Sequence, residues 1–325
     1  MMKRIMVLLL LLLSLTACGH TEEELPAEEE LIVVGISQVG AESDWRVANS
    51  ESMKAVFSEE NGYRLLFDDA RQQQDNQIMA IRKFIQQKVD YIILMPITEF
   101  GWESVLQEAK DAGIPVIIVD RMVDVADDSL FTAHVGSDLY EEGRKAVAWM
   151  EKEYSGRAKL NIIHVMGTPG STAQIGRTEA LEAAVAAHEN WNLTAQLDGD
   201  FTQAKAYEVL LRCLQELPEG QEPDVVYCEN DNEAFGAIQA LEEMGYICGR
   251  DVDVITFDAT RNCLRLCMEG KISLGVECNP LQGPLAAEII QQLEAGQMPE
   301  KYRYIEESTF TPWNLTEELI AERQY

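Results

Sequence analysis

Polar side chains follow nearly every short apolar run of this chain, at the point where the run ends. Carboxylates accept hydrogen bonds, arginines donate them, and amides and hydroxyls do both. Such a mixture is suited to a ligand with many hydroxyl groups, and aromatic rings would pack on the apolar C–H faces of that ligand. The residues at these run ends are Glu42, Trp45, Arg46, Asp69, Asp120, Arg121, Thr168, Phe201, Asn230, Asp231, Asp258 and Glu277.

Several of these residues also have a purely structural interpretation. Asp44, Asp69 and Asp231 each precede a helical pattern, and their side chains could cap those helices. The neighbours Asp120 and Arg121 could form an ion pair on the surface. The binding interpretation therefore depends on the whole set lying at one edge, because no single residue decides it.

Other chemistries receive less support. The turn at 167–171 could hold a phosphate on its backbone N–H groups, but it lacks the lysine of a P-loop. Carboxylates such as Asp69, Asp120, Asp258 and Glu277 could act in pairs as glycosidase acid and base, although the sequence does not fix their separation. No Gly-x-Ser-x-Gly nucleophile motif is present. We predict binding without catalysis, with a secreted glycosidase or sugar isomerase as an alternative that turnover of an aryl glycoside would support.

The elements that must position these side chains follow one rhythm. Short apolar runs rich in β-branched residues alternate with amphipathic stretches, which is typical of parallel sheets covered on both faces by helices. In open parallel sheets, ligands bind beyond the carboxyl ends of the strands, where the polar residues stand. The sequence therefore predicts an α/β fold with strands at 31–37, 64–68, 91–95, 116–119, 160–166, 193–197, 225–228, 252–257 and 274–277.

The rhythm breaks and restarts near 134–138, and further breaks lie near 277–280 and 309–313. Three breaks predict two similar lobes with several chain crossings between them, which would form a hinge rather than a simple linker. The predicted first lobe comprises 31–135 plus 278–308, and the second comprises 136–277 plus 309–325.

The N-terminus carries a predicted export signal. Lys3 and Arg4 precede an apolar run at 5–15, which is shorter than the roughly 20 residues that span a bilayer. Thr16, Ala17 and Cys18 follow this run, and the whole segment resembles the bacterial lipoprotein signal, which is cut before a cysteine that is then lipidated. We predict a signal peptide at 1–17, lipidation of Cys18 and an acidic tether at 18–30. The chain would then be extracytoplasmic, with this anchor as its membrane contact.

Charge and cysteine usage exclude further classes. The formal net charge of −30 argues against nucleic-acid binding, which needs a basic face. The four histidines are scattered, so neither a metal site nor a cofactor is predicted. The six later cysteines show no spacing of a small disulfide scaffold, and several lie in apolar runs where cysteine packs as a small hydrophobe. They are Cys213, Cys228, Cys248, Cys263, Cys267 and Cys278.

From residue 31 to the C-terminus, the chain resembles the type I periplasmic sugar-binding proteins of ABC transporters, a ribose- and galactose-binding-like family. Residues 34–46 and the pair Asp120-Arg121 are the most specific, and they look most like the galactofuranose-binding members of that family. The wider family is marked by the stretches 72–77, 101–110, 114–121, 199–202 and 236–240.

The resemblance implies two Rossmann-like lobes joined by a three-crossing hinge that closes on a monosaccharide. It implies a monomer that delivers galactofuranose, or a similar furanose, pentose or hexose, to an ABC permease. A sensor that presents its closed form to a receptor or sensor kinase is the alternative, and a cytoplasmic regulator of the same fold is opposed by the export signal. The residues implied to line the site are Glu42, Trp45, Arg46, Asp69, Asp120, Arg121, Thr168, Arg177, Phe201, Asn230, Asp231 and Asp258, with Glu277 near the hinge.

Overall fold

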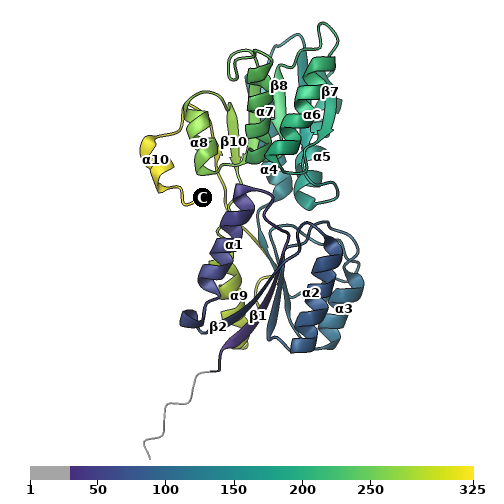
Figure 1. The fold of residues 1–325 in the computed structure, drawn as a ribbon, viewed down its shortest axis with the longest axis vertical. Coiled ribbons are helices and arrows are strands. Elements are labelled where there is room, and N and C mark those ends of the chain that lie inside the picture. Colours follow the sequence, from purple (N-terminus) through teal and green to yellow (C-terminus); the bar gives the residue numbers. More distant parts are fainter. Residues whose placement is uncertain (1–29) are drawn as a thin grey trace, which may run out of the picture. The chain divides into compact units, whose positions relative to one another are not determined.

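Two sheets of six strands organise residues 30–325, the part of the chain that the computed structural model describes (Figure 1). The predicted signal peptide, Cys18 and the tether up to residue 29 lie outside the described residues. The strands are β1 (Ile32–Gln38), β2 (Tyr63–Asp69), β3 (Tyr91–Leu94), β4 (Val116–Val119), β5 (Ala133–Gly136), β6 (Leu160–Met166), β7 (Trp191–Asp198), β8 (Val225–Cys228), β9 (Asp253–Asp258), β10 (Leu274–Glu277), β11 (Tyr302–Tyr304) and β12 (Thr309–Phe310).

The strand order is β11-β5-β4-β3-β1-β2 in the first sheet and β12-β10-β9-β8-β6-β7 in the second. All pairings are parallel except that of β12 with β10. Parallel order brings the carboxyl ends of β1 to β5 to one edge of the first sheet and those of β6 and β8 to β10 to one edge of the second. The predicted two-lobe α/β class is confirmed.

Helices connect the strands, and their N-terminal caps correct one expectation. Ser43, Gln73 and Asn230 occupy the cap positions, so the alternative in which Asp44, Asp69 and Asp231 cap helices is wrong. The helices are α1 (Asp44–Val56), α2 (Gln74–Gln87), α3 (Glu103–Asp111), α4 (Leu139–Glu153), α5 (Thr172–Ala187), α6 (Gln203–Glu216), α7 (Asp231–Glu243), α8 (Arg261–Met268), α9 (Gly283–Glu294) and α10 (Glu317–Glu322), with short 3-10 turns at Glu59–Asn61 and Asp128–Leu130.

Each sheet is covered on both faces. In the first lobe, α1 and α9 pack on one face and α2 and α3 on the other (Figure 1). In the second lobe, α6, α7 and α8 cover one face, and α4 and α5 cover the other. All six cysteines from 213 to 278 are free thiols, and Cys228 lies in the core as predicted. Within residues 30–325, every helix is too short or too polar to cross a lipid bilayer.

The chain passes between the sheets three times. The first crossing (137–138) joins β5 to α4, the second (278–282) joins β10 to α9, and the third (305–308) joins β11 to β12. Residues Leu31–Tyr325 form one compact unit that contains both lobes. The assignment of the two predicted residue sets as separate domains stays a prediction.

All nine predicted strands are present, but the sequence pattern missed β5, β11 and β12. β11 has three residues and β12 has two, which is too short to give an apolar run. β5 is a four-residue strand that contains His134, whose buried ring donates from Nε2 to the carbonyl of Asp120 at 2.9 Å. These strands form because neighbouring strands supply their hydrogen bonds.

Candidate functional site

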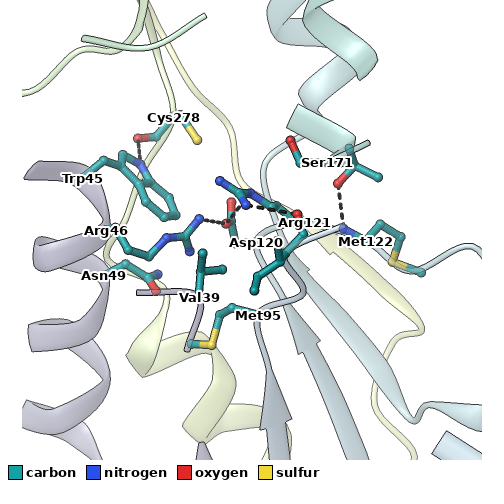
Figure 2. Close-up of polar contacts among 12 residues, drawn as sticks. Val39, Trp45, Arg46, Asn49, Met95, Asp120, Arg121, Met122, Ser171 and Cys278 are labelled. Atoms are coloured by element: carbon teal, nitrogen blue, oxygen red, sulfur yellow. Dashed lines mark hydrogen bonds and ion pairs between the residues drawn. The ribbon is translucent and has the colours of Figure 1, made fainter. Parts of the chain in front are cut away.

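A network of buried charges occupies the site edge of the first lobe. The Ser43 side chain caps α1 by accepting from the backbone N–H of Arg46, and the first turn of α1 then directs Arg46 inward. Arg46 donates to Glu42 at 3.1 Å. It also donates to Asp120, just past β4, at 2.7 Å (Figure 2). Arg121 lies 3.5 Å from Glu42 and 4.0 Å from Asp120. Two arginines and two carboxylates therefore share partners, and all four side chains are almost completely buried.

Burial and neighbouring charges act on these arginines in opposite ways. Burial lowers the pKa of Arg46, but Asp120 and Glu42 outweigh that effect and raise it overall. For Arg121, burial and the Arg46 charge prevail over the same carboxylates and lower the pKa to about 10. Both guanidinium groups remain charged at neutral pH and can donate hydrogen bonds to a ligand.

The second lobe presents a third buried arginine. Arg177, on α5, donates to Glu142 of α4 through Nε at 2.8 Å, and its Nη2 lies 3.8 Å from Asp258 at the end of β9. Its Nη1 also donates to the carbonyl of Glu229. Burial lowers the pKa of Arg177, but Glu142 and the other negative groups nearby, among them Asp258, together outweigh that effect and raise it overall. Asn230 caps α7 and donates to the carbonyl of Phe201 at 3.1 Å.

Unusual backbone conformations direct three of these side chains. Asp120, Phe201 and Asp258 have φ of 66°, 58° and 102°, a region that non-glycine residues seldom adopt. Such strain persists where the surrounding structure requires it and is concentrated at ligand sites. Each of the three follows a strand, so the chain turns sharply there and places the side chain at the sheet edge.

The two lobes touch at the site edge. At this edge, the indole N–H of Trp45 donates to the carbonyl of Cys278 on the second crossing at 2.7 Å (Figure 2). The N–H of Met122 donates to Thr172 Oγ1 at 2.8 Å, so a first-lobe loop bonds to the start of α5. The guanidinium of Arg121 lies 5.0 Å from the ring centre of Phe201, within cation–π range. These contacts connect the facing edges around the site.

Between these edges lies a small cavity, which we call the cleft cavity. Two buried carboxylate oxygens at this cavity, Glu42 Oε2 and Asp258 Oδ2, have no hydrogen-bond partner among the described residues. Burial raises the pKa of Asp258 well above its ordinary value, and the nearby Asp231 adds to that effect. The cavity is lined by Glu42, Ser43, Trp45, Arg46, Asp120, Arg121, Ala173, Arg177, Phe201, Asn230, Asp258 and Cys278.

Nine of the thirteen predicted site residues line this cavity, and four do not. Asp69 is exposed at the end of β2, where it accepts from the N–H of Arg71 at 2.8 Å. Thr168 donates to Asp200 at 2.9 Å. Asp231 is fully buried and binds threonines of the second lobe, while Glu277 pairs with Arg323 near the C-terminus. The structure thus gives these four residues protein partners in place of a position at the cavity.

Sequence reasoning missed three lining residues and one supporting carboxylate. Ser43, Ala173 and Cys278 carry no strand-end charge, and Ala173 gives no chemical signal in the sequence. Glu142, the partner of Arg177, lies in the first turns of α4, where an acidic residue is usually solvated. A helix arginine such as Arg177 that faces a glutamate from another helix can be recognised only once the helices are packed.

Phe201 can cover the cavity because Gly167 lies beside it. A Cβ at position 167 would overlap the Phe201 ring. We expect Gly167→Ala to displace this ring and to weaken ligand binding in the cavity about 10- to 100-fold, since overpacking costs about 1–3 kcal/mol. Isothermal titration calorimetry with the ligand that most stabilises the wild type measures the change.

Gly275→Ala is the matched control for this substitution. Its Cβ would lie 3.1 Å from Cys263 Sγ in the second-lobe core, away from the cavity lining. It should lower the melting temperature while leaving the affinity unchanged. Equal affinities of the wild type and Gly167→Ala would show that the Phe201 ring does not contact the ligand.

The fold and the site edge define the class of protein. A family described as "Periplasmic binding protein domain" matches residues 34–298, and the chain belongs to this family. Its architecture, two parallel sheets whose carboxyl edges enclose one cavity, is the architecture that the resemblance implied.

Three relatives narrow the comparison. The galactofuranose-binding protein YtfQ of Escherichia coli (strain K12) is 36% identical over 289 residues, covering 89% of this chain and 90% of that protein. The binding component of the arabinose ABC transporter from Shewanella sp. ANA-3, solved with L-arabinofuranose, is 37% identical with a TM-score of 0.84, covering 90% of this chain and 95% of that one. A Mycobacterium smegmatis structure in complex with β-D-fucofuranose is 37% identical with a TM-score of 0.82, covering 87% and 92%.

Proposed function

We propose that this chain is an extracytoplasmic binding protein that captures one neutral monosaccharide, in furanose form, in the cleft cavity. The observation that carries the proposal is the pair of buried, unpartnered oxygens, Glu42 Oε2 and Asp258 Oδ2, one from each lobe. A buried polar atom without a partner is costly, and a sugar hydroxyl relieves that cost. A ligand that bonds both oxygens favours the closed arrangement of the lobes.

The charge of the lining supports a neutral ligand. The three arginines at the cavity already have carboxylate partners: Glu42 and Asp120 pair with Arg46 and Arg121, and Glu142 pairs with Arg177. An anionic ligand would add an uncompensated buried charge, which is strongly unfavourable.

The furanose form rests on relatives. The proteins from E. coli, Shewanella and M. smegmatis named above bind or were solved with galactofuranose, arabinofuranose and fucofuranose, respectively. The residues we assign to the ligand are the lining residues that the sequence predicted: Glu42, Trp45, Arg46, Asp120, Arg121, Arg177, Phe201, Asn230 and Asp258.

A thermal-shift screen tests this function. L-Arabinose, D-galactose and D-fucose, together with furanose-fixed analogues, should raise the melting temperature, because a ligand at about 100 times its Kd adds roughly 2.7 kcal/mol to stability. The corresponding sugar acids serve as the control and should produce no shift. A response to the acids, to amino acids or to nucleotides without any response to neutral sugars would overturn the proposal.

We further propose that the chain acts as a monomer, without catalysis, tethered through a lipid on Cys18, and that it delivers its sugar to an ABC permease. Deleting the gene should abolish high-affinity uptake of the sugar identified in the screen. A deletion strain that takes up the sugar normally but no longer responds to it would instead assign the chain to sensing.

A further inference from the structure

One carboxylate joins all three chain crossings. Glu307 lies on the third crossing, and its Oε1 accepts from Ser137 Oγ of the first crossing and from the N–H of Asn279 of the second, each at 2.6 Å. Ser137 Oγ also lies 3.3 Å from Cys278 Sγ. The three segments that must bend when lobes move are therefore fastened at one point.

Two further donor atoms meet Glu307 at this point. A carboxylate oxygen of Glu142, the Sγ of Cys278 and a carboxylate oxygen of Glu307 all lie within 4.8 Å of one another. Glu142 is fully buried, and its Oε1 has no partner among the described residues. A buried carboxylate oxygen without a partner is costly, and a metal ion held between it, the second carboxylate and the thiol would relieve that cost.

We propose that Glu142, Cys278 and Glu307 form a binding site for a divalent transition metal ion with affinity for thiolate, of which Zn²⁺ is the best match. Zn²⁺ takes Cys sulfur at about 2.3 Å and carboxylate oxygen at about 2.0–2.2 Å, so tetrahedral donors stand roughly 3.5 Å apart. A contraction of about 1 Å brings the three donors to that spacing. Three protein ligands leave the fourth position to water.

The surroundings already orient these ligands as metal sites require. Arg177 donates to Glu142 Oε2 at 2.8 Å and leaves Oε1 to the metal. Ser137 and Asn279 hold Glu307 by its Oε1. Such outer hydrogen bonds fix the direction of ligating carboxylates and contribute to metal affinity.

A metal ion at this site would connect the chain crossings to the second lobe. The metal would fasten two crossings, through Cys278 and Glu307, to α4 of the second lobe, through Glu142. Arg177, which bonds Glu142, also lines the cleft cavity, so the metal and the ligand of that cavity share a neighbour. The metal site itself does not depend on the proposed function, and it can be tested without any sugar.

Co²⁺ titration of the full chain, purified without a histidine tag and freed of metal with a chelator, tests the site. Co²⁺ bound to a thiolate gives a charge-transfer absorption band in the near ultraviolet, and Zn²⁺ should displace it. Cys278→Ser should abolish the band, whereas Cys213→Ser, at a half-buried cysteine of α6, should retain it. Glu307→Gln should weaken binding by about 100-fold, whereas Glu306→Gln, at the exposed neighbour, should not.

Melting curves of each variant establish that it is folded, and Glu142→Gln provides a second ligand variant if Cys278→Ser is unstable. Absence of the band in the wild type, or a band of equal strength in Cys278→Ser, would overturn the proposal. Co²⁺ binding without thiolate absorption would also overturn it, because the acidic surface would then be the binding location.

Discussion

Arg121→Ala should raise the Kd for the sugar at least about 100-fold, because removing one partner of a buried, hydrogen-bonded charge cluster costs about 2–5 kcal/mol or more. Arg121 lies among Glu42, Asp120 and the Phe201 ring and donates to the carbonyl of Ile97 at 3.2 Å. The substitution removes a donor from the cavity and the cation that Phe201 covers. Isothermal titration calorimetry measures the loss.

The fold should survive this change, since Arg46 still bonds both Glu42 and Asp120. Arg121→Lys retains the charge without the planar fork and should bind with intermediate affinity. Arg82→Ala is the control: Arg82 pairs with Glu108 on the surface, where an ion pair contributes little, and the Kd should stay within about twofold. Unchanged affinity of a folded Arg121→Ala would remove Arg121 from the assigned site.

Asp231→Ala should lower the free energy of unfolding by about 3 kcal/mol while changing the sugar Kd less than about threefold. Asp231 Oδ2 accepts from the N–H and the hydroxyl of Thr260, each at 2.7 Å, and Oδ1 accepts from Thr256 at 3.1 Å. Removing the carboxylate leaves these buried donors unpaired at the start of α8. Urea denaturation measures the stability, and calorimetry measures the affinity.

Asp231→Asn keeps the shape and one acceptor oxygen, so its loss of stability should be smaller than that of the alanine variant. The opposite result for Asp231→Ala, normal stability with lost binding, would restore the ligand contact that the sequence predicted. Measuring both quantities therefore separates a residue that supports the site from one that touches the ligand.

Much of the fold was predictable because its strongest signals are local. Runs such as Val116–Val119 are continuous and β-branched, which is typical of strands buried on both faces. β11 and β12 were not predictable, because they carry too few residues for a pattern and depend on β5 and β10 for their hydrogen bonds. The pairing of β11 with β5 and of β12 with β10 depends on tertiary contacts, so no local sequence pattern reveals it.

The site was predictable where a side chain follows directly after a central strand. Asp120, Arg121 and Asp258 follow β4 or end β9, and parallel order places these strand ends at the site edge. Asp69 failed to reach the cavity because β2 lies at the edge of its sheet, away from the middle strands. Glu277 ends a strand beside β12, where Arg323 and Tyr325 donate to its Oε1 and the N–H of Ser308 donates to its Oε2.

By itself, the sequence determined the α/β class, the family resemblance and the kinds of side chain that gather at the strand ends. It did so because strand periodicity and residue chemistry are properties of short stretches. Only the tertiary structure decided which of those side chains reach the cavity and which bind the protein instead. Which residues reach the cavity depends on contacts between residues far apart in the sequence, such as the ion pair of Glu142 with Arg177 and the hydrogen bond of Thr260 to Asp231. It also depends on the positive φ of Asp120 and Asp258, which directs their side chains inward.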